Sequence, residues 1–203
     1  MPILASPVLE VEETPLWQRR RLAFLKLAES ARRNEPGARA DFEATLSHFE
    51  RRPFFHTPPE VMDIIGLFYI PKDGASAALP MVVAASVLGC HDVLRFASAS
   101  GREEIFFNER FLQRAYLVAG PQTLQSVEAL VSSHRAQVKR LVEEGLRLAE
   151  GFRMETEYEP RWPEAYGLEH LLGETEIPSA SIASWENLWG EAKRQVAAYY
   201  GAR

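Results

Sequence analysis

Apolar side chains recur at alternating steps of three and four residues between residues 121 and 152. This spacing places them on one stripe of a single α-helix of about eight turns. Gly120-Pro121 marks the start and Gly151 the end, because proline suits the first helical turn and glycine takes the left-handed cap most easily. We therefore expect an unbroken central helix around which the other segments pack. The stripe consists of Leu124, Val127, Val131, His134, Val138, Leu141, Gly145, Leu148 and Phe152.

The rest of the chain is also dominated by helical spacing, which predicts an all-α fold. Residues 78–96 are apolar almost all round, as expected for a buried helix, whereas 154–159 alternate like a short strand. Residues 64–70 fit either the end of a helix or a short strand. Further helices are predicted over 14–33, 57–68, 102–119, 164–172 and 185–199, and one more follows the turn of residues 34–37. The residues expected on their buried faces are Phe42, Leu46, Phe49, Phe107, Phe111, Ala115, Trp185, Trp189, Ala192, Val196 and Tyr199.

We expect a single-domain multi-helix bundle, since 203 residues suit one domain. Residues 1–13 are predicted to be an extended lead-in, and residues 14–152 the core of the bundle. Residues 153–203 then form an irregular acidic and aromatic segment, extended in part, and a C-terminal helix that packs on the same domain.

Charge and composition argue against several classes of protein. A net charge of -5 argues against nonspecific nucleic-acid binding, and one cysteine excludes an intramolecular disulfide. Met1–Glu13 shows no secretory signal, and the apolar run of residues 75–89 is shorter than the roughly 20 residues that a membrane span needs. We therefore expect a cytoplasmic protein that is neither membrane-bound nor bound to nucleic acid.

The sequence lacks the usual motifs of metal and cofactor sites. No histidine has a glutamate three residues before it, and neither His-Glu-x-x-His nor a glycine-rich phosphate loop is present. Cys90, His91 and Asp92 are consecutive, but adjacent helical residues point about 100° apart and do not make a triad. We expect neither a metal nor a cofactor, and we expect Cys90 to be a buried small side chain.

An aromatic and acidic segment near the C-terminus is the best candidate for a partner-binding surface. Tryptophan and tyrosine are frequent anchors of protein interfaces, and the glutamates would attract a basic partner. The alternative is that these rings fold back into the core. Residues 14–52 carry a net charge of +4 and residues 150–176 a net charge of -6, so a further alternative is that the two regions attract each other within one molecule. The candidate residues are Tyr158, Trp162, Tyr166, Glu155, Glu157 and Glu159.

We therefore hypothesise a non-enzymatic helical module that binds a protein or peptide, such as an adaptor, an inhibitor or an immunity-type protein. The alternative is an enzyme or ligand carrier whose pocket between helices is lined by His134, His91, His56 and nearby carboxylates. A third hypothesis is a homodimer, in which the heptad-like stripes of 124–152 and 185–199 pack between copies.

Overall fold

A computed structural model describes residues 23, 25–31, 33–51, 57–155, 162–173 and 180–202. Within these ranges the chain forms helices and turns, and no strand occurs. The predicted all-α, multi-helix fold with a long central helix is therefore confirmed. The lead-in of residues 1–13 lies outside the described residues.

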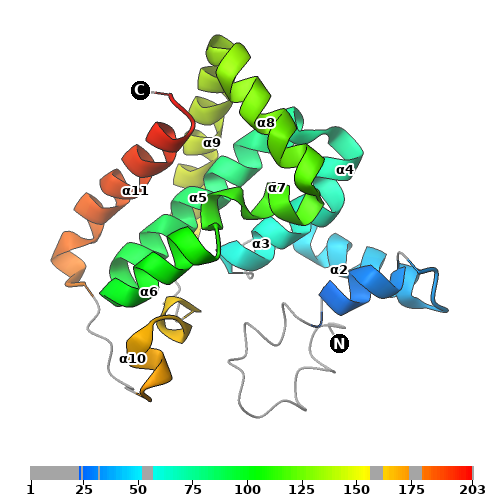
Figure 1. The fold of residues 1–203 in the computed structure, drawn as a ribbon, viewed down its shortest axis with the longest axis horizontal. Coiled ribbons are helices and arrows are strands. Elements are labelled where there is room, and N and C mark those ends of the chain that lie inside the picture. The colour runs from blue at the N-terminus through cyan, green and yellow to red at the C-terminus, as the bar shows by residue number, and fades with distance from the viewer. Residues whose placement is uncertain are drawn as a thin grey trace.

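The central helix is α5, Ala75–Phe96, which is buried along most of its length. Its composition explains this position, because a helix that is apolar on all sides can be covered on all sides. Two long helices pack along it, α9 (Arg135–Glu155) and α11 (Trp185–Tyr199), as Figure 1 shows. Trp189, Ala192 and Val196 form the buried face of α11, as their spacing predicted, whereas Tyr199, predicted on the same face, is 40% exposed.

The predicted unbroken helix over 121–152 is wrong. The chain forms α8, Pro121–Ser133, and then α9, with a break at His134 (φ -127°, ψ 48°). The two helices on either side of the break have different packing partners. Helix α8 lies on α7 (Arg114–Ala119), and α9 lies on α5. Gly151 does not end the helix, because α9 continues to Glu155. A strand was predicted over 154–159. Residues 154 and 155 are instead the end of α9, and residues 156–159 lie outside the described residues.

The predicted helix over 102–119 is also divided. It consists of α6 (Ala99–Glu103), the π-helix η5 (Glu104–Asn108), the 3-10 turn η6 (Phe111–Gln113) and α7. Phe111 and Ala115 are buried as predicted, but Phe107 is 77% exposed. A π-helical turn holds more residues than an α-turn and shifts the buried face, so Phe107 leaves the apolar stripe.

The N-terminal half follows its predicted helices closely. Residues 25–31 are helical, and α2 spans Ala38–Arg51. Residues 64–70 are helical rather than a strand, in the run α3 (Pro58–Ile64), π-helix η4 (Ile65–Tyr69) and α4 (Ile70–Asp73). The guanidinium of Arg114 donates from Nε to Oδ1 of Asp63 at 2.8 Å, and this buried ion pair joins α7 to α3.

The described residues between α9 and α11 form three short elements: the 3-10 turns η7 (Trp162–Ala165) and η8 (Ile182–Ser184), and the four-residue helix α10 (Leu168–Leu171). The helix predicted over 164–172 is thus shorter, because a 3-10 turn and a bend precede it. In Figure 1, α10 lies at the edge of the molecule beside α6.

Candidate functional site

Residues 162–173 dock on α5 and α6 through a buried tryptophan. The indole Nε1 of Trp162 donates a hydrogen bond to Oδ2 of Asp92 at 2.8 Å, and its ring stacks on Phe111 at 5.8 Å. Tyr166 meets the Trp162 ring edge-on at 6.3 Å. Both aromatic residues are buried. For these two residues the exposed partner-binding surface is therefore wrong and the alternative holds, in which the rings fold back into the core. Helix α5 and the turn η6 supply the acceptor and the aromatic partner that these rings need.

Hydrogen bonds to side chains of α6 and η5 hold the second half of this segment. The amide of Gly167 donates to Oε2 of Glu104 at 2.8 Å, and the amide of Leu168 donates to Oγ of Ser100 at 2.7 Å. Oε2 of Glu169 accepts from the hydroxyls of Ser98 and Ser100. These two hydroxyls hold the pKa of Glu169 below its ordinary value. The orientation of α10 on the surface is thereby fixed.

At Gly167 the segment of residues 162–173 lies very close to α6. It has a φ of +97°, and a Cβ at this position would lie 2.6 Å from the amide nitrogen of Gly101. Only glycine meets both requirements, the left-handed backbone and the close contact. The position of α10 is therefore specified by backbone geometry as well as by side-chain hydrogen bonds.

The outer face of α10 carries three exposed leucines. Leu168, Leu171 and Leu172 are 58%, 79% and 68% exposed, and we call them the leucine patch. Their spacing of i, i+3 and i+4 puts them on one side of the helix, since Leu172 keeps helical backbone angles at the C-cap. An apolar helix face that points to water is typical of a binding surface. The spacing of these leucines is visible in the sequence, but such a spacing normally predicts a buried face.

The segment that carries the leucine patch is acidic. Residues 162–173 contain two glutamates and no lysine or arginine. Glu164 and Glu169 belong to the docked segment itself, and Glu104 of η5 contacts it. A partner of the leucine patch would therefore meet negative charge around apolar side chains.

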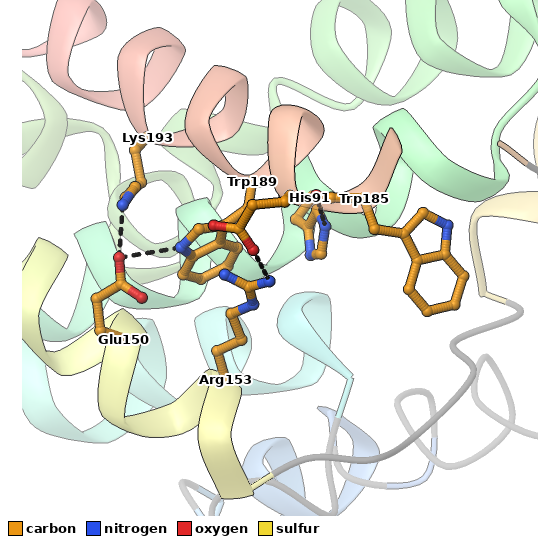
Figure 2. A network of polar contacts seen from close by, with 7 residues as sticks. His91, Glu150, Arg153, Trp185, Trp189 and Lys193 are labelled. Atoms are coloured by element: carbon orange, nitrogen blue, oxygen red, sulfur yellow. Dashed lines mark hydrogen bonds and ion pairs between the residues drawn. The ribbon is translucent and has the colours of Figure 1, made fainter. Parts of the chain in front are cut away.

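A second polar cluster clamps α11 onto α9 and α5 (Figure 2). Oε1 of Glu150 accepts from Nζ of Lys193 and from the indole Nε1 of Trp189. The guanidinium of Arg153 pairs with Glu186 and lies 4.9 Å above the Trp189 ring. Hydrogen bonds to Lys193 and Trp189 outweigh the effect of burial and lower the pKa of Glu150. These charges pair with one another across the helix interface, so the cluster is a structural clamp.

His91 lies beneath this clamp, where Figure 2 shows it against α11. Its Nε2 is 3.2 Å from the carbonyl oxygen of Trp185, and the bond requires the tautomer with a proton on Nε2. Its ring meets the Trp189 ring edge-on at 5.1 Å. Burial, with a smaller contribution from the charge of Arg95, lowers the pKa of His91 from 6.5 to about 4. The ring is therefore neutral at ordinary pH and held in packing contacts.

The predicted histidine pocket is not formed by His91 and His134. His134 is exposed at the break between α8 and α9, whereas His91 is buried under α11. An exposed residue at a helix junction does not line an interior cavity. His56 lies outside the described residues, as do Glu157, Tyr158, Glu159 and the side chain of Glu155.

Cys90 is fully buried in α5, and burial raises the pKa of its thiol far above the ordinary value. A thiol in this state is a poor nucleophile. Among the residues that the structure describes, no group of three histidine, cysteine, aspartate or glutamate side chains is arranged to hold a metal ion.

Within the described ranges, α5 is the one helix that is long and apolar enough to cross a membrane. However, 78% of its most apolar stretch is buried inside the protein. It is therefore a core helix in this fold. The leucine patch, by contrast, is an apolar helix face that is exposed to water. Comparisons of the chain with protein-family models, with curated proteins and with solved structures gave no match.

Proposed function

We propose that this protein is a non-enzymatic module that binds another protein or a peptide through the leucine patch. The observation that carries the proposal is the exposure of Leu168, Leu171 and Leu172 on one face of a short helix. Fully burying a leucine side chain is worth about 1.5–3 kcal/mol, so a partner that covers all three gains several kcal/mol.

The docking of residues 162–173 supports this role. Trp162 and the contacts of Glu169 with two serines fix α10 before any partner arrives. A surface that is already ordered loses less conformational entropy on binding than a flexible one. Trp162 and Tyr166 thus support the binding surface from inside, in place of the direct contact that their sequence pattern predicted.

The proposal is tested by site-specific photo-crosslinking in the native host. A photoreactive amino acid at position 171 is expected to give a discrete adduct with one partner protein. The adduct should disappear when Leu168→Asn and Leu172→Asn are introduced, because both substitutions make the patch polar. These side chains are exposed, so each substitution should change the free energy of unfolding by no more than about 0.5 kcal/mol.

Position 182 provides the matched control. Ile182 is 76% exposed and belongs to η8, which Figure 1 shows away from α10 at the start of α11. The same photoreactive residue at position 182 should not give the adduct. Equal adducts from positions 171 and 182, or an adduct from 171 that survives the two asparagine substitutions, would contradict the proposed function.

A further inference from the structure

The charge around the leucine patch specifies what kind of partner fits it. Resting on the proposed function, we infer that the partner presents a basic amphipathic helix, whose apolar side chains cover Leu168, Leu171 and Leu172 and whose lysines or arginines face Glu104 and Glu169. This inference combines the exposed apolar face with the charge of the segment that carries it.

The negative charge is held in place next to the patch. Glu169 follows Leu168 directly, and its carboxylate is fixed by Ser98 and Ser100. Glu104 is fixed in the same region by the amide of Gly167. Hydrogen bonds from the serine hydroxyls favour the ionised form of Glu169, so the charge persists at neutral pH.

Arg102, the basic residue of α6, does not neutralise the glutamates next to the leucine patch. Arg102 donates from Nε to the carbonyl of Ala97 and from Nη2 to the carbonyl of Leu94. Both acceptors belong to the C-terminal end of α5, where a cation is favoured by the helix dipole. The guanidinium is therefore directed at α5.

The size of the patch favours a short segment of a partner over a second copy of this chain. Helix α10 has four residues and is about 6 Å long, whereas a stable interface buries about 800 Å² on each partner. A second copy would also bring the same glutamates and a net charge of -5 against its own kind. Like charges that face each other across an interface disfavour the complex.

A membrane surface is also disfavoured as the occupant. Membrane-bound segments usually carry lysine or arginine, which the anionic lipids attract. Residues 162–173 have neither. An anionic bilayer would therefore repel the residues that surround the leucine patch.

Two synthetic helical peptides of equal length and identical leucine face test the inference, one with lysines and one with glutamates on its polar face. Binding to the full chain is measured by fluorescence anisotropy. The lysine peptide should bind at least about tenfold more tightly than the glutamate peptide, and its affinity should fall as salt is raised. Leu171→Asn with Leu172→Asn should weaken it by about tenfold or more, and Ile182→Asn should leave it unchanged.

Other outcomes would overturn the inference in distinguishable ways. If both peptides bind equally and both lose affinity in the leucine variants, the basic partner is wrong and the binding function stands. If neither peptide binds while the cross-link from position 171 persists, the partner class is likewise wrong. Self-association in sedimentation that the leucine variants abolish would identify a second copy as the occupant, and patch-dependent binding to neutral lipid vesicles would identify a membrane.

Discussion

The indole nitrogen of Trp162 lies 2.8 Å from Oδ2 of Asp92, which joins two residues seventy positions apart in the chain. The other oxygen of Asp92 accepts from Nη2 of Arg95 at 2.9 Å. The carboxylate is buried on the central helix, so these donors compensate its loss of water. The hydrogen bond fixes the segment that carries the leucine patch to the most buried part of the fold.

Replacing Trp162 is therefore expected to destabilise the whole protein. Trp162→Phe keeps most of the ring but removes a donor to a buried carboxylate, and should lower the free energy of unfolding by about 1–3 kcal/mol. Trp162→Ala also leaves a cavity next to Phe111 and should cost about 3–5 kcal/mol. Urea unfolding measures both values.

Leu171→Asn on the same segment is the control, because Leu171 is exposed. It should change the free energy of unfolding by no more than about 0.5 kcal/mol. Equal stability of Trp162→Ala and the unchanged protein would mean that Trp162 is not a core residue.

Replacement of two glycines of α9 by alanine should change the stability of the protein in opposite directions. A Cβ at Gly145 would lie 2.5 Å from Cβ of Val83 and 2.7 Å from the carbonyl oxygen of Pro80, whereas a Cβ at Gly151 meets nothing within 4 Å. Gly145→Ala should destabilise the contact of α9 with α5 by about 1–3 kcal/mol. Gly151→Ala should stabilise the helix by about 0.5–1 kcal/mol. Thermal unfolding of the two variants gives the comparison, and stabilisation by both would contradict the close packing of these helices.

His91 should make stability depend on pH. Its pKa is about 4 in the folded protein and near 6.5 in the unfolded chain. Between these values the unfolded chain binds more protons than the folded protein, so the free energy of unfolding falls as the pH is lowered from about 6.5 to 4. The charged groups that act on the ring are Arg95, Arg153 and Glu186.

His91→Gln is the matched variant, since an amide can still donate to the Trp185 carbonyl. The free energy of unfolding should depend less steeply on pH in this variant. Between pH 6.5 and 4 the slope should be smaller by the equivalent of up to about one bound proton. Denaturant titrations at several pH values measure the slope. Identical slopes for the two proteins would show that His91 is not buried in its neutral form.

Cys90 should be protected from thiol reagents in the native protein. Its side chain has no exposure on α5, and its raised pKa keeps the thiolate population low. Labelling should be slower than in the urea-unfolded chain by about a hundredfold or more, because it requires opening of the core. Labelling of the native protein at the unfolded rate would contradict the buried position of α5.

The sequence predicted those helices whose burial follows from their own composition. The all-round apolar pattern of residues 78–96 identifies a buried helix without knowledge of its neighbours. The spacing of Trp189, Ala192 and Val196 identifies the inner face of α11. In both cases the local pattern and the tertiary packing agree.

The break at His134 was not predictable from spacing, because the apolar positions continue across it. Ser132, Ser133 and His134 are weaker helix formers than alanine, but each difference is below about 1 kcal/mol and tertiary packing decides. The candidate site failed for a related reason. The sequence left open whether Trp162 is exposed or buried, and the spacing of the three leucines favoured a buried face. The arrangement of α5, α6 and α10 buries Trp162 against Asp92 and leaves the leucines in water.

The most direct test of the binding surface is amide hydrogen exchange on the protein with and without the partner identified by cross-linking. If the leucine patch is the binding surface, the partner slows exchange at residues 168–172 and residues 182–184 exchange as before. Slowed exchange confined to other helices, with residues 168–172 unchanged, would contradict the assignment of the leucine patch as the binding surface.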